Sequence, residues 1–185
     1  MSPTRLLRTI RLDPSDTFVF ERAADPGEWA VTGSFLFMET DPDKLDRGER
    51  AAFRSGFVGV RSLGFSTLVV VSEASEEEHE AAVTQLARHI LTSLGAPSEA
   101  VARAAAREEL AVSASLCGPG VNAVIAMHRS IVDGELHEQF RTLQPRQGSP
   151  EADRLHAGVR AFQFVEVEDG PDERVDLATL AGPPR

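Results

Sequence analysis

The sequence of 185 residues contains a single cysteine, Cys117, and no tyrosine. One cysteine cannot form a disulfide within the chain, and no second cysteine is present to share a structural zinc ion. The sequence therefore predicts a fold that is stabilised by its hydrophobic core, in a reducing compartment that we expect to be the cytoplasm.

Long apolar runs and an excess of basic residues are also missing. The apolar stretch at residues 67–71 is far shorter than the roughly 18 residues of a membrane helix, and no stretch approaches that length, so we expect no membrane segment. The 19 Lys and Arg residues are outnumbered by 29 Asp and Glu, and the net charge is -10. Because nucleic acids and anionic membranes bind clustered basic residues, this charge disfavours both as partners.

The sequence motifs of common enzymes are absent. It contains no GxGxxG after a strand, no GxxxxGK[ST], no GxSxG and no HExxH. We therefore assign no catalytic residue, no cofactor and no metal ion from the sequence.

The apolar pattern of the first half predicts mainly strands. Residues 6–12, 17–21 and 28–38 are expected to form an antiparallel meander, because Asp-Pro turns separate short apolar runs. A short helix is expected between residues 41 and 56. Residues 65–72 contain a run of β-branched residues, which predicts a strand buried on both faces.

Two capped helices follow. Ser75 and Glu78 form a capping box, and an apolar stripe with helical spacing leads from there to Gly95. Ser98 caps a second helix, expected over 99–116, which is rich in Ala, Arg and Glu. We expect the two helices to form a helical hairpin that packs on one face of the sheet.

A β-hairpin is predicted for residues 122–143, because Asp133-Gly134 is typical of a two-residue type I′ turn. The turn length sets the register of the two strands. One face carries the pairs Ile131–Leu136, Arg129–Glu138 and Met127–Phe140, and the other carries Ser130–His137 and His128–Gln139.

These elements predict an α+β fold with an antiparallel or mostly antiparallel sheet of five to seven strands. We expect a single domain over residues 1–147. Residues 148–185 read as an acidic C-terminal tail that adds at most one strand, at 162–167.

Candidate site residues lie on the hairpin. Arg129 and Glu138 interrupt its apolar face, either as a structural ion pair or as part of a pocket in which Arg129 binds an anionic ligand. His128 and His137 lie diagonally adjacent on the other face, within reach of one ligand, or are ordinary surface histidines. A metal ion needs more ligands than these two, so no metal is assigned.

Three aromatic residues, Trp29, Phe35 and Phe37, allow two interpretations. They are core residues, or they form the aromatic centre of a protein interface.

Several segments resemble a family of small uncharacterised alphaproteobacterial proteins, a domain of unknown function. The resemblance is carried by RTIRLD (8–13), DTFVF (16–20), GEWAV (27–31), FRSGF (53–57), HR (128–129) and FRTL (140–143). It spans roughly residues 4–147, implies a bacterial cytoplasmic protein and transfers no activity.

The leading functional hypothesis is a non-catalytic accessory protein that binds another protein or forms a homodimer. The alternative is a small-molecule binding protein or enzyme with a pocket between sheet and helices. In that alternative Arg129 anchors an anionic ligand, and His128 or Glu138 transfers a proton.

Overall fold

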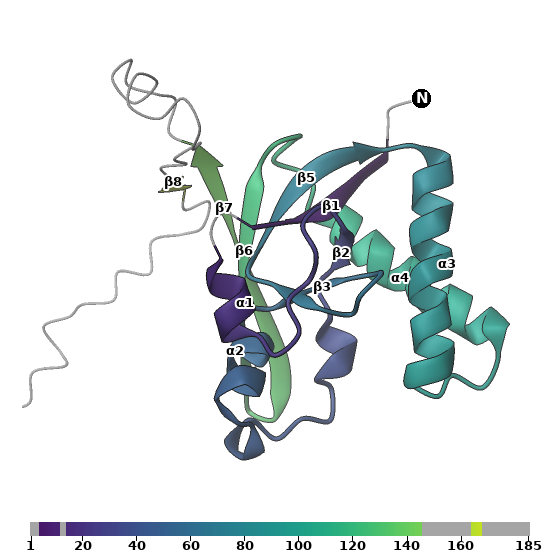
Figure 1. Ribbon diagram of the computed structural model, residues 1–185, viewed down its shortest axis with the longest axis horizontal. Helices are drawn as coiled ribbons and strands as arrows, with labels where there is room; N and C mark the ends of the chain where they lie inside the picture. Colours follow the sequence, from purple (N-terminus) through teal and green to yellow (C-terminus); the bar gives the residue numbers. More distant parts are fainter. Residues whose placement is uncertain (1–3, 12–13, 146–163, 168–185) are drawn as a thin grey trace, which may run out of the picture.

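A computed structural model describes residues 4–11, 14–145 and 164–167, which form one antiparallel sheet with helices at two of its sides (Figure 1). The strand order is β4-β3-β2-β1-β5-β6-β7-β8. The strands are β1 (Thr4–Ile10), β2 (Trp29–Val31), β3 (Phe57–Gly59), β4 (Phe65–Ser66), β5 (Leu68–Ala74), β6 (Val124–Val132), β7 (Glu135–Pro145) and β8 (Phe164–Val167). The expected α+β class and antiparallel sheet are confirmed, with seven strands up to residue 145, and β8 lies within the stretch 162–167.

Four α-helices and two short 3-10 helices complete the described part of the chain. They are α1 (Ser15–Val19), α2 (Arg47–Ser55), α3 (Glu76–Ser93) and α4 (Glu99–Ser115), with 3-10 turns at Ser34–Leu36 and Pro42–Lys44. The capping box of α3 is present, with Ser75 and Glu78 each accepting the other's backbone N–H. Figure 1 shows α3 and α4 side by side at one end of the molecule, and α1 and α2 at the other.

The helical hairpin of α3 and α4 buries one face of the sheet. Leu6, Val31 and Val58 of the sheet share a core cluster with Leu86 of α3 and Leu110 of α4, and all five are fully buried. Burial of such side chains contributes about 1.5–3 kcal/mol each. This cluster therefore fixes the hairpin against β1, β2 and β3.

The opposite face of the sheet curls around a second cluster. The rings of Phe57 in β3 and Phe140 in β7 have centroids 6.4 Å apart, although β2, β1, β5 and β6 lie between these strands in the sheet. Leu7, Val71 and Ile125 from the intervening strands are buried with them. The curl thus brings β6 and β7 toward β2, β3 and α2.

The predicted strand at residues 17–21 is wrong, because α1 occupies Ser15–Val19. A tertiary contact holds this helix: the buried carboxylate of Asp16 accepts hydrogen bonds from the backbone N–H and the hydroxyl of Thr67. Phe18 is 85% exposed, and Phe20 is the member of this apolar run that is buried in the core.

Two further strand predictions are too long. The strand expected at 28–38 ends at Val31, and Gly33 then turns the chain with a positive φ of 79° into a 3-10 helix. The strand expected at 65–72 is divided at Thr67 into β4 and β5, since Thr67 bonds to Asp16. Val69 and Val71 are buried, but Leu68 and Val70 are only half-buried, so the strand is not buried on both faces.

The β6–β7 hairpin has the predicted register in all five residue pairs. Asp133 and Gly134 have φ values of 53° and 81°, as a type I′ turn requires. Beyond Ala126, β6 extends past the start of β5, and α2 packs beside this extension. The hairpin therefore carries Arg129 and His128 out to α2.

Candidate functional site

Arg129 is the largest fully buried side chain among the described residues, with 1% of its surface exposed. Its Nε donates to Oε1 of Glu138 at 2.9 Å. Its Nη1 donates to the backbone oxygen of Phe53 at 2.7 Å, and its Nη2 to that of Thr32 at 2.6 Å. The guanidinium also lies over the ring of Phe37, 4.8 Å from its centroid. Burial lowers the pKa of Arg129, and the bond to Glu138 and its charge oppose that shift.

These hydrogen bonds link three parts of the structure through Arg129. Each of its three guanidinium nitrogens donates within the protein, and the acceptors come from β7, from α2 and from the end of β2. A buried cation with this set of acceptors has little capacity left for an external ligand. Of the two interpretations of Arg129 and Glu138, these contacts favour the structural ion pair.

Glu109 of α4 approaches the same network from the helical side. It is half-buried, and burial, together with the negative charges of Glu138 and Glu108, raises its pKa to about 7. Glu109 therefore exchanges a proton near neutral pH. No sequence pattern marks this residue, because its environment depends on the tertiary packing of α4.

A groove of about 590 Å³ lies between α2 and the extension of β6. We call it the α2–β6 groove. It is lined by Pro42, Asp43, Arg50, Phe53, Arg54, His128, Arg129, Ser130 and Ile131. Of the four hairpin candidates, the groove contains His128 and the buried Arg129, whereas His137 and Glu138 lie outside it.

The α2–β6 groove is positively charged in a protein of net charge -10. Arg50 uses one bond, from Nη2 to the backbone oxygen of Leu45 at 3.0 Å, and Arg54 has no side-chain partner among the described residues. Both side chains are exposed, and they lie on one side of α2 because they are four residues apart. Among the described residues of the lining, Asp43 contributes the only carboxylate.

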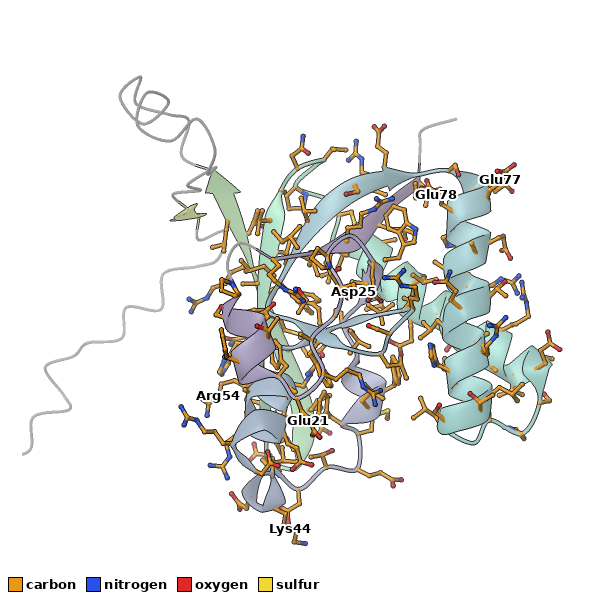
Figure 2. All side chains as sticks on the ribbon, viewed as in Figure 1. Glu21, Asp25, Lys44, Arg54, Glu77 and Glu78 are labelled. Carbon is orange, nitrogen blue, oxygen red and sulfur yellow. The ribbon has the colours of Figure 1, made fainter. Side chains whose placement is uncertain are left out.

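Acidic side chains gather at the other end of the molecule. Figure 2 shows Arg54 at α2 and Glu77 and Glu78 at the start of α3, on opposite sides of the sheet. Glu78 pairs with Arg8 at 3.3 Å, but Glu77 has no ion pair among the residues that the structure describes. Of these two helices, α2 contains more Arg than Glu, and α3 contains more Glu than Arg.

His128 and His137 are both exposed on the outer face of the hairpin, in the diagonal arrangement that the register predicts. Within residues 4–11, 14–145 and 164–167, no three His, Cys, Asp or Glu side chains are grouped so that they could hold a metal ion. The two histidines can therefore offer hydrogen bonds to a ligand.

The three aromatic candidates do not share one surface. Phe37 is 7% exposed and packs edge-on against Phe53, with ring centroids 5.5 Å apart. Trp29 and Phe35 are half-buried against the core cluster of α3 and α4, and the guanidinium of Arg8 covers the Trp29 ring at 3.9 Å. Phe37 is a core residue, which leaves Trp29 and Phe35 as the partly exposed members of the set.

Cys117 follows α4 and is buried. Its thiol donates to the backbone oxygen of Ser113 at 3.5 Å, and burial raises its pKa to about 11. The thiol is therefore protonated at neutral pH, which makes it a poor nucleophile.

The fold and its groove define a small α+β protein with a curled antiparallel sheet and a basic surface groove. In the described part of the chain, no helix is long and apolar enough to cross a membrane. The chain belongs to the Family of unknown function (DUF6505), whose model matches residues 4–160. No curated protein and no solved structure matches the chain.

Proposed function

We propose that this protein is a non-catalytic accessory protein of the bacterial cytoplasm that binds an acidic segment of another protein in the α2–β6 groove. The supporting observation is the pair Arg50 and Arg54, two exposed arginines of which Arg54 has no partner among the described residues. Exposed basic side chains in a groove favour an anionic partner, because complementary charges attract each other.

The groove combines charge with hydrogen-bonding and apolar groups. Arg50 and Arg54 present planar guanidinium groups, which bind carboxylates with two parallel hydrogen bonds. His128 and Ser130 add hydrogen-bonding groups from β6, while Phe53 and Ile131 supply apolar surface. An extended segment that alternates acidic and small residues would match this lining.

A labelled acidic peptide tests the proposal directly. We would measure fluorescence anisotropy of a peptide of alternating glutamate and glycine against the whole chain. Saturable binding is expected, weakening as salt screens the exposed charges. The double variant R50A/R54A should bind about tenfold more weakly, because two charged hydrogen-bond donors are lost.

Arg88 supplies the matched control. It is exposed on α3, and its side chain has no partner among the described residues, so R88A removes one positive charge away from the groove. R88A should bind the peptide like the unmodified protein. Absence of saturable binding, or equal weakening by R88A and R50A/R54A, would contradict the proposal.

A small anionic ligand near Arg129 is the second candidate. Its support is the groove volume of about 590 Å³, which falls within the roughly 300–1,000 Å³ of small-molecule sites. In this case Arg54 binds the anion, and Arg129 is only part of the groove lining. Isothermal titration with citrate and inorganic phosphate distinguishes the two: tight binding of either that R54A removes, with no peptide binding, would support the small ligand.

A further inference from the structure

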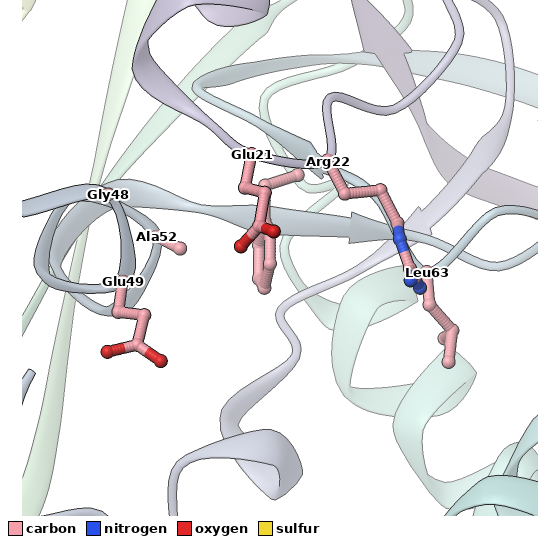
Figure 3. A pocket seen from close by; sticks show the side chains of 7 residues that line it. Glu21, Arg22, Gly48, Glu49, Ala52 and Leu63 are labelled. Carbon is pink, nitrogen blue, oxygen red and sulfur yellow. The ribbon is translucent and has the colours of Figure 1, made fainter. Parts of the chain in front are cut away.

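A second pocket, of about 400 Å³, lies on the other flank of α2 and shares no residue with the α2–β6 groove. We call it the Glu21 pocket. Its lining comes from three separate segments of the chain: Glu21 and Arg22, then Gly48, Glu49 and Ala52 of α2, then Leu63 and Phe65 (Figure 3).

Hydrogen bonds and ring contacts hold the first and the third of these segments together. The backbone N–H of Phe65 donates to the oxygen of Arg22 at 2.8 Å, and the oxygen of Phe65 accepts from Ala24 at 2.8 Å. The ring of Phe65 packs against Phe20 and Phe37, with centroids 5.8 and 6.0 Å away. The apolar wall of the pocket is therefore preformed.

The charged groups of the Glu21 pocket are available to a ligand. Neither Glu21 nor Arg22 has a side-chain hydrogen bond or ion pair with any described residue, and both are exposed. Glu49 uses Oε2 to accept from the backbone N–H of Asp46 at 2.9 Å, which leaves Oε1 free of that cap. Figure 3 shows the carboxylates of Glu21 and Glu49 on the side of the pocket away from Leu63.

Gly48 is the residue of the pocket lining at which a side chain can be added with little effect on packing. It lies in the first turn of α2, where glycine is a weaker helix former than alanine. A β carbon at Gly48 would meet Asp46 Oδ1 at 3.6 Å and the oxygen of Val19 at 3.7 Å, both ordinary contacts. Its φ is not left-handed. Neither packing nor backbone geometry therefore requires glycine at a position that lines a pocket.

We propose that the Glu21 pocket binds a small molecule in which an ammonium group adjoins an apolar body, as in an apolar amino acid. The ammonium group would lie against the carboxylates of Glu21 and Glu49. The apolar body would cover Phe65 and Leu63, and Arg22 would pair with the ligand's carboxylate. This site is separate from the proposed acidic-segment groove and does not depend on it.

Ligand-detected NMR with isothermal titration tests this on the whole chain. The probes are L-phenylalanine, which carries both charged groups, and phenethylamine, which carries only the ammonium group. We expect saturable binding of L-phenylalanine, weakened at least about fivefold in E21Q because a carboxylate partner is lost. R22Q should weaken L-phenylalanine and leave phenethylamine unchanged.

G48A separates binding from folding. The added methyl group should enter the pocket and weaken both probes, while the melting temperature stays equal or rises. E39Q is the matched control for E21Q, because Glu39 is exposed and outside both pockets.

Three results would overturn the assignment: no saturable binding of either probe, equal binding by G48A, or equal weakening by E39Q and E21Q. Binding of phenethylamine with L-phenylalanine unaffected by R22Q would overturn the role of Arg22 alone. None of these variants changes the α2–β6 groove, so the peptide assay reports the proposed function separately.

Discussion

Arg129 and Glu28 are both buried charged residues, and the protein satisfies them by different means. Arg129 has an oppositely charged partner, Glu138, at 2.9 Å and two backbone carbonyl acceptors. Glu28 accepts three backbone N–H groups, from Asp25 at 2.9 Å, from Ser62 at 3.0 Å and from Arg61 at 3.1 Å. Its nearest cation, the side chain of Arg61, is 4.0 Å away.

The difference lies in what each residue leaves behind when it is removed. Loss of Arg129 leaves the carboxylate of Glu138 without its cation, and the Glu138 side chain is only 16% exposed. Loss of Glu28 leaves only neutral backbone amides without their acceptor, and these amides belong to two surface turns. A buried unpaired charge lowers the free energy of unfolding more than unpaired amides do. Removing Arg129 should therefore destabilise the protein more than removing Glu28, although both residues are buried.

The largest effect is expected for R129M. It should lower the free energy of unfolding by about 3–5 kcal/mol, because one partner of a buried ion pair is lost along with donors to Phe53 and Thr32. Urea denaturation followed by circular dichroism measures the change, with R88M as the surface control. The double variant R129M/E138M should recover part of the loss, since it removes the stranded charge. No recovery would show that the carbonyl bonds, rather than the ion pair, account for the effect.

E28A should destabilise the protein by about 2–3 kcal/mol, less than R129M, because three amides lose their acceptor. E28Q keeps one carbonyl oxygen and should have an intermediate effect in the same denaturation assay. If E28A lowered the free energy of unfolding as much as R129M does, this would contradict the claim that an unpaired charge is more destabilising than unpaired amides. Gly59 makes room for this carboxylate, since a β carbon there would clash with Glu28.

Glu109 extends the comparison, because an acid adjoins the Arg129 network. Burial and the charges of Glu138 and Glu108 raise its pKa from 4.5 to about 7. The folded state therefore binds this proton more tightly than the unfolded state, and the native state loses stability as pH rises from 4.5 to 7.

The substitution E109Q should remove this loss of stability at higher pH, because glutamine does not ionise. Because the side chain is only half-buried, we expect a gain of about 1–2 kcal/mol at pH 8 and no gain at pH 4. Urea midpoints of E109Q and the unmodified protein across this pH range measure the effect, and E39Q, at an exposed glutamate outside α4, serves as the control. Parallel pH profiles for E109Q and the unmodified protein would contradict the raised pKa.

The smallest effect is expected for R61A. The side chain of Arg61 is 60% exposed and pairs with Asp25, which is 67% exposed, at 2.9 Å. Exposed ion pairs contribute little, so the melting temperature should change by no more than corresponds to about 0.5 kcal/mol. A larger loss would mean that the guanidinium of Arg61, and not only its backbone N–H, supports Glu28.

The two networks also differ in how far the sequence predicts them. The pair Arg129–Glu138 follows from the turn Asp133-Gly134, because a two-residue turn determines which residues face each other. Nothing in the sequence marks Glu28, whose acceptor role depends on backbone N–H groups 33 and 34 residues away. Amides are present at nearly every residue, so their positions follow only from the folded backbone.

The incorrect predictions have a similar cause. Residues 17–21 have the apolar composition of a strand, yet Asp16 bonds to Thr67, 51 residues later, and a helix forms instead. Phe18 and Val19 then point outward, with 85% and 45% of their surfaces exposed. A short apolar run does not distinguish strand from helix by itself.

The sequence alone determined the capped helices α3 and α4, the register of the β6–β7 hairpin and the α+β class. These features depend on caps, turns and side-chain spacing, which act between residues close together in the chain. Only the tertiary structure decided that Arg129 bonds to residues 76 and 97 positions away, and that Arg54 and His128 line one groove. The physical reason is the curl of the sheet, which results from packing of both faces at once and sets which distant side chains meet.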